Sequence, residues 1–408
     1  MKRPYRSSLW LSGLLASACC RVSGQPHERS ISSMSNTIQE HQSLTLLKSP
    51  GDSILEDPSH MIHLMPHLHG DSGDDHQIFN FEFDFGGIPN DNSPDIVRWN
   101  TLRLNETLKR EEVSHNATLI FPANRTFFFF HDIHAAELEN VVFQIDAHIK
   151  LERNQSESIY WDVQANPDRK HPMALFYFYK GHNITLTSSN GEGRIDGNGP
   201  QWWGIPFWGY LQITEHRPYL MEFNRTTDLT ISNLLFKDSP LYTMRLESVN
   251  QVEIHDISII SRRTNSELHT LLDLSAFNTD GIDVSGHNVW IHDVDIWTQD
   301  DCVAVKDNMS FEQGQISSNM TFERIRASGT GFVIGSIGRS EVRNITFRDS
   351  YLYKSFKGKF IQLDEAGQRR RIQFLGASLT RIYLLYVFTH LSASLFDRDI
   401  HEVSKYKA

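Results

Sequence analysis

The stretch Asn319-Met320-Thr321-Phe322, which returns 25 residues later as Asn344-Ile345-Thr346-Phe347, decides the fold of this chain. Each copy begins with a turn residue and continues with alternating apolar and polar side chains. That alternation has the period of a β-strand and not that of a helix. Related phrases, at intervals of 23 to 45 residues, begin at Asn140, Asn183, Asp228, Gln251 and Asn288.

A strand phrase that recurs at such intervals, without helical segments between the copies, predicts a solenoid. The shortest intervals are near 24 residues, and the first two are near twice that length, which indicates loops inserted in some coils. We therefore expect an all-β, single-stranded parallel β-helix whose coils stack at about 4.8 Å. A β-sandwich is the alternative, but its strands have no reason to repeat a turn-led phrase at this interval.

A solenoid must cover the open end of its first coil, and a helix is predicted to do so here. Ser93 suits the N-cap position, and Pro94 suits the first helical position. The buried face of this capping helix is expected to consist of Ile96, Trp99, Leu102 and Leu108.

Three aspartates interrupt the same rhythm on two neighbouring segments. Asp280 lies in Phe-Asn-Thr-Asp-Gly-Ile-Asp (277–283), and Asp300 and Asp301 lie in Gln-Asp-Asp-Cys (299–302). Aspartate is a poor strand residue, so these three need a chemical reason. Glycosidic hydrolysis supplies one, because one carboxylic acid protonates the leaving oxygen while another carboxylate activates water or attacks the sugar. Ionisation of all three neighbouring carboxylates is opposed by the repulsion between their charges, so one of them should keep its proton.

The sequence between about Ser93 and Gly358 resembles the family-28 glycoside hydrolases, the polygalacturonases and their pectin-degrading relatives. The order and spacing of five phrases carry the resemblance. They are Asn-Thr-Asp (278–280), Gln-Asp-Asp-Cys-Val-Ala-Val-Lys (299–306), Ser-Gly-Thr-Gly-Phe-Val-Ile-Gly-Ser (328–336), Ile-Asp-Gly-Asn-Gly (195–199) and Asp-Ser-Pro (238–240).

The resemblance implies a right-handed β-helix and an inverting mechanism on galacturonan-type polymers. It makes Asp300 the general acid, and it makes Asp280 and Asp301 the carboxylates that hold and deprotonate the attacking water. The resemblance also makes three further residues substrate-binding, namely Asn278, Lys306 and Thr330.

Two departures from the family pattern affect the expected substrate. Thr330 stands where the family usually has a histidine, and rhamnogalacturonan-cleaving relatives also lack that histidine. The family's Arg-Ile-Lys phrase, whose cations grip the sugar carboxylate, is missing, because residues 359–364 read Lys-Phe-Ile-Gln-Leu-Asp. The usual partner of the cysteine in Asp-Asp-Cys is missing too, so Cys302 is expected to be unpaired.

The three aspartates have another interpretation that involves no catalysis. Aspartates on stacked turns can form a ladder, or carboxylates on stacked coils can bind calcium. The combination of Asn-Thr-Asp with Asp-Asp matches the hydrolase pattern better, and we expect neither a metal nor another cofactor.

The N-terminus carries Lys2, Arg3 and Arg6, followed by an apolar stretch and small residues, which is typical of a secretory signal. Nine Asn-x-Ser/Thr sequons agree with secretion, although some coincide with the turn asparagines of the repeat. We therefore expect a signal peptide at 1–24, a polar flexible leader at 25–90 and an extracellular protein. No run of 18 apolar residues is present, so no membrane span is expected.

The predicted β-helix domain covers 91–358, and the tail at 359–408 is expected to be aberrant. No Asn-led phrase occurs in the tail, and Gly358-Lys359-Phe360 can be encoded with a common splice-donor sequence. The hypothesis is that the tail is translated intron.

The expected function is hydrolysis of α-1,4-galacturonan, which is polygalacturonase activity, by a monomer that contacts neither nucleic acid nor membrane. Rhamnogalacturonan hydrolysis and exo-galacturonidase activity are alternatives. An aromatic-rich loop between Trp203 and Arg217 has two interpretations: it closes one end of the cleft and favours exo action, or it simply packs as a loop. A protein of another class, an inactive carbohydrate-binding β-helix, is also possible, because Thr330 and the missing cations favour it while the intact aspartates oppose it.

Overall fold

A computed structural model describes residues 76–153, 174–204, 217–263 and 276–355, and the shorter segments 358–363, 368–375, 378–380 and 400–403. These residues belong to the second of two compact units, which divide between Asp71 and Ser72. The expected signal peptide and most of the expected leader lie outside the described residues. Within the described ranges, no helix is long and apolar enough to cross a membrane.

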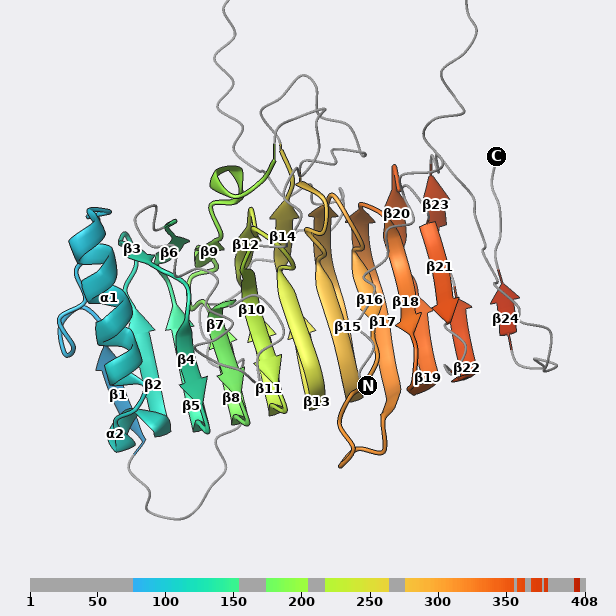
Figure 1. The fold of residues 1–408 in the computed structure, drawn as a ribbon, viewed down its shortest axis with the longest axis horizontal. Coiled ribbons are helices and arrows are strands. Elements are labelled where there is room, and N and C mark those ends of the chain that lie inside the picture. Colours follow the sequence, from blue (N-terminus) through green and yellow to red (C-terminus); the bar gives the residue numbers. More distant parts are fainter. Residues whose placement is uncertain are drawn as a thin grey trace, which may run out of the picture. The chain divides into compact units, whose positions relative to one another are not determined.

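The strands stack as parallel ladders in three sheets, and each coil visits the first, second and third sheet in turn (Figure 1). The first sheet contains β1 (Gln77–Asn80), β2 (His115–Phe121), β5 (Glu139–Ile145), β8 (His182–Thr187), β11 (Thr227–Ser232), β19 (Glu341–Arg348), β22 (Gln368–Leu375) and β24 (Ile400–Val403). The second sheet contains β3 (Thr126–Phe129), β6 (His148–Leu151), β9 (Arg194–Asp196), β12 (Leu235–Lys237), β14 (Ser258–Ser261), β20 (Tyr351–Tyr353) and β23 (Ser378–Thr380). The third sheet contains β4 (Ile133–Ala136), β7 (Ala174–Tyr179), β10 (Tyr219–Asn224), β16 (Val303–Val305), β18 (Gly331–Ile337) and β21 (Gly358–Leu363).

Three long strands bend from one sheet into the next. They are β13 (Met244–His255), β15 (Ile282–Thr298) and β17 (Ile316–Ser328). β15 pairs with β13 and β16 in the third sheet, with β13 and β17 in the first, and with β14 and β17 in the second. This arrangement confirms the predicted right-handed parallel β-helix.

The alternation of the repeat explains the core, because inward side chains of successive coils stack on one another. Phe178 and Phe223 lie with ring centroids 4.7 Å apart, and Phe322 and Phe347 lie 4.6 Å apart, with all four rings buried. Such ring pairs contribute about 0.5–1.5 kcal/mol beyond the burial of apolar area. Stacked aromatic rings therefore connect some neighbouring coils, while aliphatic side chains such as Leu246 and Val284 fill the core between β13 and β15.

The turn residue that leads each phrase has a left-handed backbone, and several of the asparagines hydrogen-bond to one another across coils. Asn183, Asn288, Asn319 and Asn344 have φ between 49° and 57°, a region that asparagine tolerates better than most residues. Nδ2 of Asn319 donates to Oδ1 of Asn288 at 3.2 Å, and Nδ2 of Asn344 donates to Oδ1 of Asn319 at 3.0 Å. The recurring asparagine thus has a structural role, which accounts for three of the sequons.

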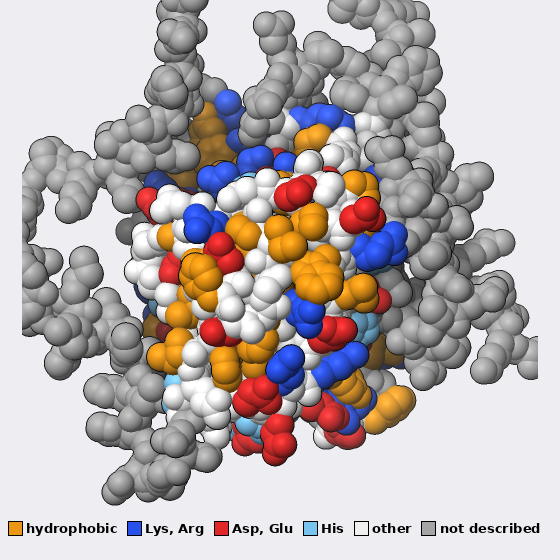
Figure 2. All heavy atoms as spheres, turned by 90° about the vertical axis from the view of Figure 1, so that its left-hand side faces the viewer, with side chains coloured by type: hydrophobic (Ala, Val, Ile, Leu, Met, Phe, Trp, Pro, Cys, Tyr) orange, Lys and Arg blue, Asp and Glu red, His pale blue; other side chains and the backbone are white. Residues whose placement is uncertain are grey.

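Helix α1 (Pro94–Thr107) covers the first coil, as predicted, with Ser93 at the N-cap position; a short helix α2 (Glu111–Ser114) follows (Figure 1). Ser93 makes no side-chain cap bond. Figure 2 shows the face at this end, where hydrophobic side chains lie among acidic and basic ones.

The predicted buried face of α1 was wrong for Trp99 and Leu102, whereas Leu108 is buried and Ile96 is half-buried. Trp99 and Leu102 are 42% and 57% exposed, and the helix instead buries Val97, Asn100, Leu104 and Thr107. Asn100 is buried because its amide exchanges two hydrogen bonds of 2.8 Å with the backbone of Ile88. Trp99 lies outside because its Nε1 donates to the carbonyl of Gly86 at 2.9 Å.

The predicted domain boundary at residue 91 came too late. β1 already pairs in parallel with β2, and Phe81 is fully buried against Phe121 and Phe127. The polar composition before residue 76 hid a short strand and a core ring. The β-helix therefore begins before the capping helix.

The expectation that the repeat ends at Gly358 was also wrong. β21, β22 and β23 pair in parallel with β18, β19 and β20, so another coil follows. Ile372 occupies the register of Ile345, and Phe374 occupies that of Phe347. The apolar alternation continues there without a leading asparagine. The prediction missed this coil because it required that asparagine.

Candidate active site

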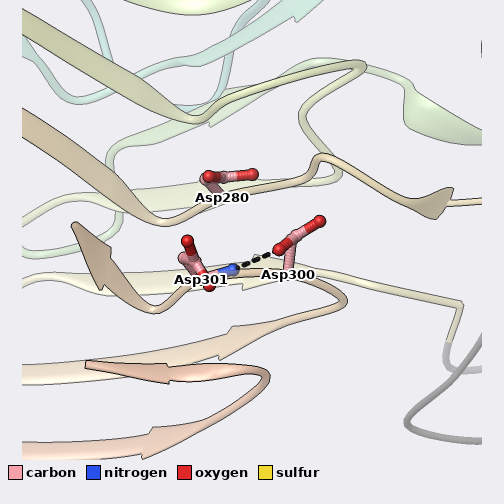
Figure 3. A group of neighbouring side chains, drawn as sticks. All are labelled: Asp280, Asp300 and Asp301. Atoms are coloured by element: carbon pink, nitrogen blue, oxygen red, sulfur yellow. Dashed lines mark hydrogen bonds between the residues drawn. The ribbon is translucent and has the colours of Figure 1, made fainter. Parts of the chain in front are cut away.

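Asp280, Asp300 and Asp301 lie together at the turn that leads from the second sheet to the third. Asp280 occupies this turn in one coil, and the other two occupy it in the next coil (Figure 3). One carboxylate oxygen of each lies within 4.8 Å of the others. The carboxylates of Asp300 and Asp301 are directed toward the coil of Asp280 in Figure 3. The parallel stack thus brings together residues that are 20 positions apart in the sequence.

Backbone hydrogen bonds continue through these turns and fix the positions of the aspartates. Gly281 donates to the carbonyl of Asp301 at 2.8 Å, and Thr330 donates to the carbonyl of Asp300 at 2.8 Å. A side chain at Gly281 would place its Cβ 2.3 Å from the carbonyl oxygen of Cys302. The close approach of the two coils therefore requires glycine after Asp280.

Both carboxylate oxygens of Asp300 accept hydrogen bonds. Oδ1 accepts from the backbone N–H of Asp301 at 2.9 Å and from the hydroxyl of Thr330 at 3.3 Å. Oδ2 accepts from the backbone N–H of Asn278 at 3.0 Å. Donors of this kind favour the ionised carboxylate over the neutral acid.

Asp280 has the opposite environment. It is 3% exposed, and its Oδ1 has no hydrogen-bond partner among the described residues. Burial raises the pKa of the Asp280 carboxyl well above its ordinary value, and nearby carboxylates, Asp283 foremost, raise it further. Burial and the neighbouring charges therefore favour the protonated form of Asp280 in the free protein.

Two of the three predicted substrate-binding residues contact Asp300 directly. Asn278 has φ of 59° and contacts Asp300 through its backbone N–H. Thr330 is 7% exposed and offers its hydroxyl to the same carboxylate. Both residues thus lie in the cluster itself.

Lys306 follows β16, and its Nζ lies 3.4 Å from Oδ2 of Asp283. Burial lowers the pKa of Lys306, but the charges of Asp283, Asp280, Asp301 and Asp300 together outweigh it, so the pKa is raised. The lysine is therefore a local cation beside the carboxylate cluster.

Sequence reasoning missed the charged and aromatic residues beside the cluster. Asp283 is 3% exposed, and burial raises its pKa to about 6. Tyr219 and Tyr242 stack with ring centroids 5.1 Å apart, and the guanidinium of Arg245 lies 5.4 Å from the ring of Tyr219. Asp283 lies between the core residues Ile282 and Val284 on β15. The alternation of the strand could therefore have predicted that its side chain points outward, on the same strand that follows Asp280. The tyrosines and the arginine gave no such signal.

The donor set does not favour the calcium interpretation. Both oxygens of Asp300 already accept hydrogen bonds, and burial favours a neutral Asp280, whereas calcium prefers ionised carboxylates and several free oxygen ligands. Cys302 is a free, buried thiol with a pKa raised to about 12 by burial, which agrees with its expected unpaired state. The loop expected to favour exo action falls at 205–216, outside the described residues.

Comparison with known proteins points to one family. The model of glycosyl hydrolases family 28 matches residues 138–383, and so extends beyond Gly358. The crystal structure of an endo-xylogalacturonan hydrolase from Aspergillus tubingensis has the same fold, with a TM-score of 0.55 and 22% identity over 69% of this chain and 70% of that one.

Two curated relatives carry the names of different activities. An endopolygalacturonase of Emericella nidulans is 29% identical over 212 residues, which cover 50% of this chain and 50% of that protein. Rhamnogalacturonase B of Aspergillus niger is 27% identical over 183 residues, which cover 44% of this chain and 28% of that protein. The chain thus spans half or less of these relatives.

Proposed function

The chain belongs to family 28 of the glycosyl hydrolases, and we propose that it hydrolyses glycosidic bonds in the backbone of a pectic polysaccharide. The observation that carries the proposal is the cluster of Asp280, Asp300 and Asp301 on adjacent coils. Such a cluster supplies both a proton donor and a base, which are the two functions that glycosidic hydrolysis needs.

In the proposed reaction, Asp300 gives its proton to the glycosidic oxygen as the bond to the anomeric carbon breaks. Asp280 and Asp301 hold a water molecule, and one of them accepts its proton as the water oxygen bonds to the anomeric carbon. The product has the inverted configuration. Asp300 must be protonated when substrate is bound, although its hydrogen bonds favour the ionised form in the free protein. A proton shared within the cluster, held first at Asp280, meets that requirement.

The spacing of the carboxylates does not by itself select inversion. Inverting pairs are usually about 6.5–9.5 Å apart and retaining pairs about 5–5.5 Å. The closest oxygens here lie within 4.8 Å of one another. Inversion is therefore proposed from the family resemblance, and the anomeric form of the first product tests it directly by proton NMR.

Two pectic backbones are candidates for the substrate. Galacturonan is the first, and the endopolygalacturonase relative supports it. Rhamnogalacturonan is the second, supported by the rhamnogalacturonase relative and by Thr330 in the position of the family's usual histidine. A threonine hydroxyl can position Asp300 by a hydrogen bond but does not titrate across acidic pH, so the site depends on its carboxylates for proton transfer.

Lys306 is proposed to meet a carboxylate of the substrate. Arg245 is less available, because its guanidinium contacts Glu222 at 3.3 Å and Glu247 at 2.6 Å. An extracellular, monomeric enzyme remains our proposal for location and assembly, since the polymers concerned lie outside cells.

Reducing-sugar assays on polygalacturonate and on rhamnogalacturonan test the proposed function and name the backbone. The proposal expects release of reducing ends from at least one polymer, and its loss in Asp300→Asn. A folded protein that binds either polymer but releases no reducing ends would instead be the inactive carbohydrate-binding β-helix.

A further inference from the structure

Asp283 is a buried carboxylate for which the proposed reaction has no use. It lies on β15, three residues after Asp280, and its Oδ1 has no hydrogen-bond partner among the described residues. Burying an incompletely bonded carboxylate costs free energy. Its presence beside the cluster therefore calls for a function.

Charged and titratable groups face Asp283 from each neighbouring element. They are Arg245 on β13, Tyr219 on β10, Tyr242 before β13, Lys306 after β16, and Asp280 and Asp301 in the adjoining turns. Arg245 occupies the register position opposite Asp283, but its guanidinium contacts Glu222 and Glu247. Lys306, at 3.4 Å, is the cation with which Asp283 forms an ion pair.

Lys306 has more than one possible partner. Its side chain is 30% exposed, whereas that of Asp283 is 3% exposed, so the cation lies between a buried anion and the open side of the site. The carboxylates of Asp280, Asp300 and Asp301 also attract it. An ammonium that paired with one of those carboxylates would favour its ionised form and displace the proton that an acid catalyst needs.

We propose that Asp283 is a positioning residue for the proposed hydrolysis, which holds Lys306 apart from the three catalytic carboxylates and so lets the cluster retain a proton. The inference rests on the proposed function for its catalytic consequence. Its electrostatic part rests on the ion pair and on the burial of both aspartates, Asp280 and Asp283. The negative charge of Asp283 acts in the same direction, since it is the first of the charges that oppose ionisation of Asp280.

The pH dependence of kcat/KM tests the proposal with three variants. Asp283→Asn should move both limbs of the profile to lower pH by about one unit, because a neighbouring anion is lost and Lys306 is released toward the cluster. Lys306→Gln should move both limbs to higher pH. The pH profile of the double variant should lie between those of the two single variants. Its departure from the sum of the two single shifts measures the coupling within the pair.

A merely structural role gives a different result. If Asp283→Asn lowers the rate by the same factor at every pH, or leaves the profile unmoved, the proposal is overturned. Asp283→Glu should restore much of the wild-type profile, because it keeps the charge. Wild-type activity of Asp283→Asn at all pH values would contradict the proposal equally.

A second readout does not depend on activity. The pKa of Asp283 is raised to about 6, so its stabilising contribution is fully present below about pH 4 and is lost as the pH rises through about 6. Denaturant unfolding should show this fall in the wild type and a flatter dependence in Asp283→Asn. If the wild type cleaves no pectic polymer but the stability difference appears, the proposed function fails and the charge arrangement stands. If the wild type is active and neither profile responds, the inference fails.

Discussion

Asp300 is held by the backbone on both of its carboxylate oxygens, which decides what its substitution will do. Asp300→Asn should lower kcat by about 10²–10⁴-fold, since the transferable proton is lost. The substitution also replaces one carboxylate oxygen with an NH2 group, which is a donor and faces the backbone N–H of Asn278 or Asp301. A donor facing a donor should cost about 1–3 kcal/mol of stability. Initial rates and denaturant unfolding measure the two effects separately.

Thr330→Val is the matched control for that experiment. It removes the 3.3 Å hydroxyl contact to Asp300 without placing a donor against the backbone. We expect a smaller loss of rate than in Asp300→Asn. An Asp300→Asn variant with a near-normal rate would remove this residue from the acid role.

Asp280 carries the opposite electrostatic signature, and its contribution to stability should depend on pH. Its folded-state pKa lies above the ordinary value, so the wild type loses stability as the pH rises from about 4 through that raised value. Asp280→Asn removes the titration. The stability of the variant relative to the wild type should therefore be greater at pH 7 than at pH 4, measured by denaturant unfolding at both values. Equal differences at the two pH values would show that Asp280 does not retain its proton.

The asparagine ladder gives a test at the scale of the element. Asn319 bonds to Asn288 on one side and to Asn344 on the other, with φ of 57°. Asn319→Gly should lose about 1 kcal/mol, because the bonds go while the left-handed backbone remains comfortable. Asn319→Ala should lose about 1 kcal/mol more, since alanine is strained there.

Unfolding of both variants, expressed in a bacterial host so that the Asn319 sequon carries no glycan, measures the difference. Equal stabilities for the alanine and glycine variants would mean that backbone strain is not what the asparagine relieves. Wild-type stability in both would mean that the ladder bonds contribute nothing.

Elements were predictable where the sequence repeats and were missed where the repeat changes its chemistry. The strands of the first sheet that combine a period-two pattern with a leading turn residue, such as β8 and β19, were found. The buried face of α1 was misjudged because Asn100 is a polar residue whose partner, the backbone of Ile88, lies outside the helix. The coil after Gly358 was missed because the register position of Asn344 holds Arg371.

The site was predictable to the extent that it lies in a motif. Asp280, Asp300 and Asp301 come together because the register of adjacent coils is fixed, and the sequence already implied that register. The raised pKa of Asp280 and the hydrogen bonds of Asp300 were not readable from the sequence. Those depend on which carboxylate receives backbone N–H groups and which is left buried without them, and both are properties of the folded turn.

At the scale of the whole molecule, Lys306 is a local cation in a protein whose net charge is negative. The chain has a formal net charge of −11, and the proposed substrates are polyanions. Long-range repulsion should therefore oppose the approach of the polymer, while Lys306 attracts it only at close range. The two effects differ in their reach and so in their response to salt.

Raising the ionic strength from about 0.01 M to about 0.15 M shortens the screening length from about 30 Å to about 8 Å. If net repulsion dominates, KM for a pectic polymer should fall severalfold over this range, while kcat, which reports the bound complex, should change little. Lys306→Gln should show a larger proportional fall, since its short-range attraction is absent. Initial-rate kinetics at matched pH measure both proteins. A KM that rises with salt in the wild type and becomes flat in Lys306→Gln would show instead that the local cation, and not the net charge, governs the encounter.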